Sequence, residues 1–100
     1  MKELQNKIIK WANDRNIIKG SRPHDQVGKT LEETVELYQA ILADDKDEIV
    51  DAIGDISVTL IIIAEQYGLD FEKCIRSAYN EIKDRKGKMI NGVFVKEADL

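Results

Sequence analysis

The chain contains one cysteine, one proline and six aromatic residues among its 100 residues. A single cysteine, Cys74, cannot form an internal disulfide, so we exclude a disulfide-stabilised scaffold and expect a reducing compartment, the cytoplasm. So few aromatic and turn-forming residues disfavour a turn-dense β architecture. Because Ile, Leu, Ala, Glu and Lys are abundant instead, the composition predicts an all-α fold.

Long apolar runs are also lacking. The longest, Ile56 to Ala64, is interrupted by Ser57 and Thr59 and is too short to span a bilayer. The first eleven residues lack the apolar region and cleavage site of a secretory signal, so we expect a cytoplasmic protein with no membrane partner. A net charge of −4 argues against binding of a nucleic acid polymer over the whole surface.

The 43% hydrophobic content suffices for one modest core, so we predict a single domain over residues 1–100. Apolar periodicity predicts four helices, over residues 2–18, 30–43, 47–67 and 70 to about 85. Gly20 is expected to end the first helix, and the segment 20–29 is predicted to be a loop. Thr30 and Glu33 fit a capping box at the start of the second helix.

The short link Asp44-Asp45-Lys46 requires the second and third helices to lie antiparallel and adjacent. Asn91-Gly92, between two apolar runs, predicts a short C-terminal hairpin or extended tail after a four-helix bundle. The third helix is apolar on nearly every side from Ile56 to Ala64. Four short helices leave too little material to cover it, so we expect a homo-oligomer, either a dimer or a tetramer.

Each of the two central helices carries acidic residues on one face: Glu32, Glu33 and Glu36 on the second, and Glu48, Asp51 and Asp55 on the third. At roughly 100° per residue, the first set spans about 100° of arc and the second about 60°. With residue 45 as the pivot, Glu36 lies roughly 13 Å and Asp55 roughly 15 Å from the turn. As candidates for a shared site between the two helices, we therefore rank Glu33, Glu36 and Asp55 first, Asp51 next, and Glu32 and Glu48 last.

Clustered carboxylates repel one another unless a cation neutralises them, and Mg²⁺ prefers such oxygen ligands. Simpler explanations exist for some of these residues. Glu33 fits the capping box, and Glu48 and Asp51 suit the N-terminal end of a helix. Neither explanation applies to Asp55. Metal binding and a solvated acidic face both remain open on the pattern alone.

The segments EETVEL and DEIVDAIGDISVTL resemble the paired acidic motifs of the MazG-like all-α nucleoside triphosphate pyrophosphohydrolases. The tail YNEIKDRKGKMINGVFVKE is similar to that of small stand-alone MazG-like proteins, including phage ones, and the resemblance covers roughly residues 24–97. The family pattern E-x-x-E followed by E-x-x-D is met by Glu33 to Glu36 and Glu48 to Asp51. In a second alignment Asp55 is the final Asp, and Ala52 departs from the pattern where a Glu belongs.

The resemblance implies Mg²⁺-dependent hydrolysis of a (deoxy)nucleoside triphosphate to a monophosphate and pyrophosphate, with Mn²⁺ as a substitute. Mg²⁺ would be held by Glu33, Glu36, Asp51, Asp55 and Glu48. Glu32 or Glu33 would accept the proton from the attacking water.

Further substrate contacts are expected from cations and polar side chains. Lys83, Arg85 and Lys88 would bind phosphate, although cations are also favoured at a helix C-terminus without any ligand. Asn80 would contact phosphate or base. His24, Gln26, Trp11 and Tyr79 are nucleobase candidates, although Trp11 lies on an apolar stripe that suits the core.

Two alternatives to this function stay open. One is a dUTP-type or phosphoribosyl-ATP-type pyrophosphohydrolase of the same superfamily. The other is a non-catalytic helical interaction module that binds a partner through the apolar half of the third helix and uses its acids for solubility.

Overall fold

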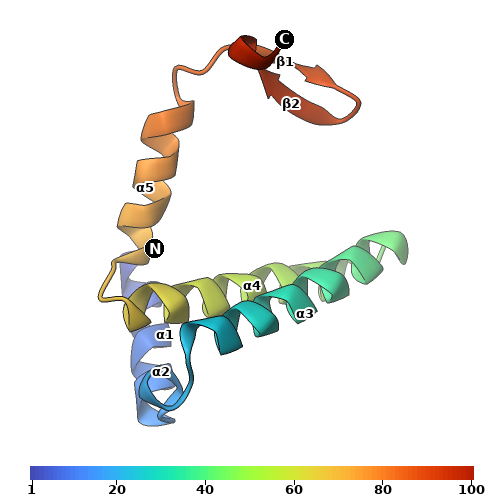
Figure 1. The fold of residues 1–100 in the computed structure, drawn as a ribbon. Helices are drawn as coiled ribbons and strands as arrows, with labels where there is room; N and C mark the ends of the chain where they lie inside the picture. The colour runs from blue at the N-terminus through green and yellow to red at the C-terminus, as the bar shows by residue number, and fades with distance from the viewer.

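A computed structural model describes all 100 residues and is built almost entirely from helices. Its centre is an antiparallel hairpin of two long helices, α3 (Pro23–Leu42) and α4 (Lys46–Gln66), which lie side by side (Figure 1). Asp44 turns the chain in the left-handed conformation, and Asp45 caps α4 by accepting a hydrogen bond from Glu48 N. The predicted all-α class and the adjacent central helices are confirmed.

The first predicted helix is divided in two. α1 (Lys2–Asp14) ends before Asn16, whose φ of 57° is left-handed, and the short α2 (Ile17–Gly20) follows. Asn tolerates this conformation better than most residues, so the break falls there although Ile17 and Ile18 continue the apolar periodicity. The prediction of one helix over residues 2–18 was therefore wrong at its C-terminal end.

The predicted loop over residues 20–29 is largely helical, because α3 starts at Pro23. Proline suits the first helical position, where its missing N–H loses no hydrogen bond. Asp25 accepts hydrogen bonds from the backbone N–H and the guanidinium of Arg22. Thr30 is thus not a cap but lies inside α3, where its hydroxyl donates to the carbonyl of Gln26 at 2.8 Å. The predicted capping box at Thr30 was wrong.

The C-terminal part follows the prediction more closely. Gly68 (φ +69°) ends the turn after α4, and Asp70 caps α5 (Phe71–Ile82). α5 ends at Ile82, earlier than expected, and the chain pairs as strands from Gly87 onward. β1 (Gly87–Ile90) and β2 (Val93–Lys96) form the predicted hairpin around Asn91-Gly92, and a 3-10 turn (Glu97–Asp99) follows.

The elements do not close into a bundle within one chain. α1 crosses the C-terminal half of α4, whereas α5 and the β-hairpin extend away from the other helices (Figure 1). Only nine residues are buried, among them Ala12, Ala52, Ile61 and Ile62. The four-helix arrangement expected from the sequence is therefore incomplete in a single copy. No helix is both long enough and apolar enough to cross a membrane.

Candidate functional site

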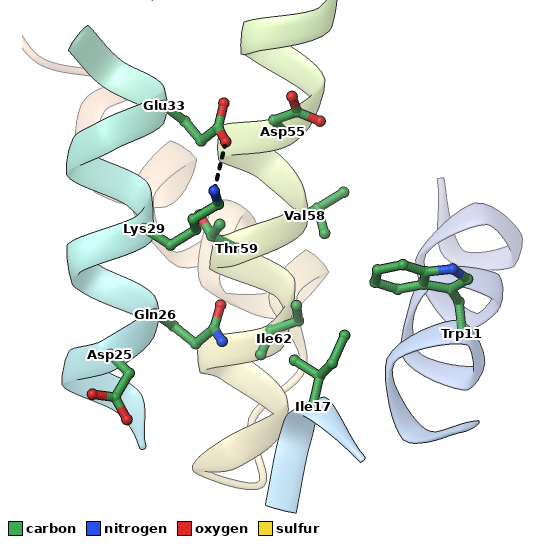
Figure 2. A pocket seen from close by; sticks show the side chains of 10 residues that line it. All are labelled: Trp11, Ile17, Asp25, Gln26, Lys29, Glu33, Asp55, Val58, Thr59 and Ile62. Carbon is green, nitrogen blue, oxygen red and sulfur yellow. Dashed lines mark ion pairs between the residues drawn. The ribbon is translucent and has the colours of Figure 1, made fainter. Parts of the chain in front are cut away.

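A cavity of about 470 Å³ opens between α1, α3 and α4. Its volume lies in the range of small-molecule sites. Trp11 comes from α1, Ile17 from α2, and Gln26, Lys29 and Glu33 from successive turns of one face of α3 (Figure 2). The remaining lining residues are Asp25 at the start of α3 and Asp55, Val58, Thr59 and Ile62 on α4. The cavity is therefore lined by apolar side chains together with charged and polar ones.

Glu33 is the charged residue most enclosed by the fold, with 7% of its surface exposed. Its Oε1 forms an ion pair with Lys29 Nζ at 3.5 Å, and its Oε2 is buried without any hydrogen-bond partner. A carboxylate oxygen without a partner is costly inside a protein. Because Thr30 is not a helix cap, capping does not explain why Glu33 occupies this position.

Asp55 projects from α4 toward the same region as Glu33 (Figure 2). Asp55 is exposed, but the packed hairpin partly shields its carboxylate from water, and this desolvation is the first cause that raises its pKa. The negative charges of Glu33 and Asp51 raise the pKa further, while the positive charge of Lys29 opposes them. The raised pKa of Asp55 shows that the positive charge of Lys29 does not fully offset the negative charge gathered here.

Two threonines fix the floor of the site. The hydroxyls of Thr30 on α3 and Thr59 on α4 are 2.7 Å apart, and Thr59 is buried. The Thr59 hydroxyl also lies 2.7 Å from the carbonyl oxygen of Ile56, so its single proton can be donated either to that carbonyl or to Thr30. This polar contact joins the two helices about one turn away from the carboxylates and so holds α3 and α4 in register there.

The comparisons with known proteins agree with this architecture. The sequence profile of the MazG-like family matches residues 27–92, which include most of α3 and all of α4 and α5. The chain belongs to the MazG-like family. This membership indicates the nucleotide pyrophosphohydrolase-type superfamily and confirms the resemblance drawn from the acidic motifs.

A relative of this MazG-like protein is an uncharacterized 18.2 kDa protein from the rep-hol intergenic region of Haemophilus phage HP1 (strain HP1c1). The two are 37% identical over 70 residues, which cover 70% of this chain and 43% of the phage protein. The match thus spans less than half of that relative. No solved structure matches the chain.

Four of the candidate residues named from the sequence line the cavity: Glu33, Asp55, Gln26 and Trp11. Asp51 lies near enough for its charge to act on Asp55. Glu32 is exposed and pairs with Lys29 at 3.4 Å, while Glu36 and Glu48 are exposed outside the cavity lining. No three Asp, Glu, His or Cys side chains are gathered closely enough to enclose a metal ion.

The other predicted substrate contacts lie elsewhere in this MazG-like chain. His24 is exposed in the first turn of α3 and does not line the cavity. Asn80 lies on α5, Lys83 follows α5, Arg85 precedes the β-hairpin and Lys88 lies on β1. These four therefore belong to the part of the chain that extends away from the hairpin of α3 and α4 (Figure 1). Their binding roles stay predictions.

Two functional candidates were missed or misplaced by the sequence-based prediction. Lys29 was assigned to a loop, so its spacing of four residues from Glu33 was not considered. Trp11 was a nucleobase candidate for which the core was the favoured place, yet it is 45% exposed and its ring points from α1 across the cavity toward α4 (Figure 2). The sequence signal that could have placed Lys29 correctly was Pro23. A helix that starts at Pro23 includes both Lys29 and Glu33 and places them on one face.

Proposed function

We propose that the chain hydrolyses a (deoxy)nucleoside triphosphate to a monophosphate and pyrophosphate, with Mg²⁺ as cofactor. The observation that carries this proposal is the juxtaposition of Glu33, whose buried Oε2 has no partner, with Asp55 on an open cavity. MazG-like membership supports the same class of reaction.

Two cavity-lining carboxylates suit a Mg²⁺ ion that keeps several waters and completes its coordination with substrate phosphates. Glu33 and Asp55 are the first candidate ligands, because both line the cavity and the negative charge of Glu33 raises the pKa of Asp55. The exposed carboxylates of Asp51, Glu36 and Glu48 are the further candidates on the same two helices. When bound, Mg²⁺ or a substituting Mn²⁺ supplies Lewis-acid activation of phosphate oxygens and of a water molecule.

The remaining tasks fall to side chains of the chain itself. Lys29 holds the carboxylates of Glu32 and Glu33 at 3.4 and 3.5 Å and presents a positive charge at the rim of the cavity. Glu32 is exposed and is the better candidate to accept the proton from the attacking water, with Glu33 as the alternative. Lys83, Arg85, Lys88, Asn80 and His24 remain further candidates for contacts with the substrate.

The apolar side of the cavity suits a nucleobase. The exposed Trp11 ring offers a stacking surface opposite Val58 and Ile62, and Gln26 offers amide groups for hydrogen bonds to a base edge. The cavity therefore combines one side for a flat ring with one side for metal-bound phosphates.

The decisive experiment measures pyrophosphate release from a panel of canonical and damaged triphosphates with Mg²⁺ or Mn²⁺. We expect turnover of at least one triphosphate, and a loss of at least about 100-fold in kcat/KM for Asp55→Asn. Asp47→Asn, an exposed carboxylate in the first turn of α4, is the matched control and is expected to retain activity. Absence of turnover across the whole panel would overturn the proposal.

Stability measurements separate this loss from unfolding. Because the pKa of Asp55 is raised in the folded chain, its ionised form at pH 7 disfavours folding. Asp55→Asn removes that charge and is expected to keep or increase Tm. If Asp55→Asn loses activity and also has a lower Tm than wild type, the loss of activity reflects a structural role of Asp55 instead.

Two alternative functions give different outcomes. A dUTP-type or phosphoribosyl-ATP-type hydrolase would turn over one substrate class within the panel and leave the rest intact. A non-catalytic interaction module would bind no Mg²⁺ in a calorimetric titration, even with a triphosphate analogue whose bond between the α and β phosphates resists hydrolysis. Saturable binding that Asp55→Asn weakens supports the enzyme.

A further inference from the structure

Gln26 lines the cavity from α3, and a chain of hydrogen bonds that begins at Ser21 holds its side-chain amide. The hydroxyl oxygen of Ser21 lies 2.7 Å from the carbonyl oxygen of Ile17. Two oxygen atoms at this distance share a proton, and a carbonyl has no proton to donate, so the Ser21 hydroxyl is the donor. Because this hydroxyl has only one proton, every other group bonded to its oxygen has to donate.

Two glutamines supply these donors. The Nε2 atoms of Gln26 and Gln66 lie 3.0 Å and 3.1 Å from the Ser21 hydroxyl oxygen. The amide of Gln66 is fixed independently, because its Nε2 also lies 3.2 Å from the carbonyl oxygen of Ile18 and 3.0 Å from that of Ser21. Carbonyl oxygens only accept. Turning over the amide of Gln26 would place its oxygen against a hydroxyl oxygen whose proton is already used.

The amide of Gln26 therefore presents its oxygen, not its nitrogen, to the cavity. Ser21 does not line the cavity, so the bond to Ser21 directs the nitrogen out of it. Figure 2 shows the amide oxygen on the Lys29 side of the nitrogen. This oxygen accepts no hydrogen bond from the chain, although Gln26 is half-buried. An enclosed acceptor without a partner favours a ligand that donates a hydrogen bond.

We propose, on the basis of the proposed triphosphate hydrolysis, that Gln26 selects the amino bases cytosine and adenine over the keto bases. Cytosine and adenine present an amino donor at the ring position where thymine and guanine present a carbonyl oxygen. The amino group donates to Gln26 Oε1, whereas a keto base in the same pose sets oxygen against oxygen. Lys29, the only cation that lines the cavity, is engaged by Glu32 and Glu33 and leaves this contact to Gln26.

Two matched pairs of substrates test this selection. dCTP and dUTP differ by an amino or a keto group at C4 of the base, and dATP and dITP differ in the same way at C6. With the full chain and Mg²⁺, we expect kcat/KM to be at least about tenfold higher for the amino member of each pair. Equal values, or a higher value for the keto member, in either pair would overturn the proposal and leave triphosphate hydrolysis itself intact.

Variants along the hydrogen-bond chain test the mechanism of selection. Gln26→Leu is of similar size but lacks the acceptor, so the amino-to-keto ratio of kcat/KM should fall to about one. Ser21 is a positioning residue, and Ser21→Ala releases the amide nitrogen, so the same ratio should also fall. Gln39→Leu is the matched control, because Gln39 is an exposed glutamine of α3 outside the cavity, and it should keep the wild-type ratio.

Circular dichroism checks the fold of each variant. If Gln26→Leu loses helix content, Gln26→Ala gives the same comparison, because alanine favours the helix and also lacks the acceptor. A wild-type amino-to-keto ratio in a folded Gln26 variant would overturn the proposal.

Equilibrium binding distinguishes a failure of base selection from a failure of the proposed reaction. The α,β-imido analogues of dCTP and dUTP resist cleavage between the α and β phosphates, so calorimetry with Mg²⁺ measures their Kd without turnover. If no triphosphate is hydrolysed, a Kd at least about tenfold lower for the dCTP analogue, lost in Gln26→Leu, still supports the selection. Equal Kd values, or no binding of either analogue, would overturn it.

Discussion

Trp11 is the residue for which exposure and position matter most to substrate binding. Its ring forms the α1 side of the cavity, and stacking of a base on an aromatic ring contributes about 1–3 kcal/mol. We therefore expect Trp11→Ala to raise KM for the preferred triphosphate by about tenfold with little change in kcat, because the base does not take part in the reaction. Steady-state kinetics on the substrate identified by the panel measures both constants.

Two further variants test whether an increase in KM for Trp11→Ala reflects lost stacking. Trp11→Phe keeps a stacking ring and is expected to restore most of the affinity. Tyr79, the other aromatic nucleobase candidate, lies on α5 outside the cavity. An increase in KM for Tyr79→Ala with no change for Trp11→Ala would place the base on α5 and contradict the stacking role of Trp11.

Single residues also mark where sequence-based prediction failed. Thr30-Leu31-Glu32-Glu33 matches a capping box, but Pro23 with Arg22 and Asp25 starts the same helix two turns earlier. Both signals are local and of similar strength. Tertiary contacts, such as the hydroxyl pair of Thr30 and Thr59, favour the earlier helix start at Pro23 over the start at Thr30. Such a contact between residues far apart in the sequence leaves no local pattern.

At the scale of elements, the link between α3 and α4 decides which carboxylates meet. With residue 45 as the pivot, Glu36 was expected opposite Asp55. The turn instead centres on Asp44, whose backbone is left-handed, and Glu33 and Asp55 lie eleven residues before and after it. The sequence thus predicted that the two acidic faces meet. The pairing of individual residues depended on a turn conformation that periodicity does not specify.

A second element contact, at Asp70, ties the start of α5 to the start of α1. The Asp70 carboxylate caps α5 at Glu72 N, accepts a hydrogen bond from the buried Gln5 at 2.9 Å, and pairs with Lys2. The hydrogen bonds from Lys2 and then Gln5 lower the pKa of Asp70 from 3.8 to about 2. We expect Asp70→Ala to lower Tm at pH 7 by roughly 4–8 °C, because the cap and the link to α1 are both lost.

The pH dependence of this effect has a definite sign. A carboxyl group with a depressed pKa stabilises the folded state above its unfolded pKa, and that stabilisation is lost as the pH falls through the folded value. The difference in Tm between wild type and Asp70→Ala should therefore shrink between pH 4 and pH 2. Asp70→Asn keeps a good helix cap but loses the negative charge, so its Tm should lie between those of wild type and Asp70→Ala. A pH-independent difference would contradict the role of the ionised carboxylate.

At the scale of the whole molecule, the hairpin of α3 and α4 has two chemically different sides. One side carries the carboxylates, the cavity and Lys29. The other exposes an apolar stripe of α3, called the apolar face, which comprises Val27, Leu31, Val35, Tyr38 and Leu42. The apolar half of α4 suggested an oligomer from the sequence alone. The face of α3 was not recognised as uncovered, because an amphipathic stripe predicts burial without indicating whether the covering surface belongs to the same chain.

Pairing through the apolar face would make stability depend on concentration, because unfolding of a dimer also separates its chains. With about 0.7 kcal/mol of unfolding enthalpy per residue over two chains, a tenfold dilution should lower Tm by about 3–4 °C. Calorimetry or circular dichroism melts between about 2 and 200 µM measure this shift. Leu31→Glu, on the apolar face, should melt at a lower Tm that does not change with dilution. Leu4→Glu, at a comparably exposed position on α1, is the control and should keep the wild-type dependence of Tm on concentration. A wild-type Tm that stays constant across this range would mean that each chain folds alone and that its apolar face remains exposed in solution.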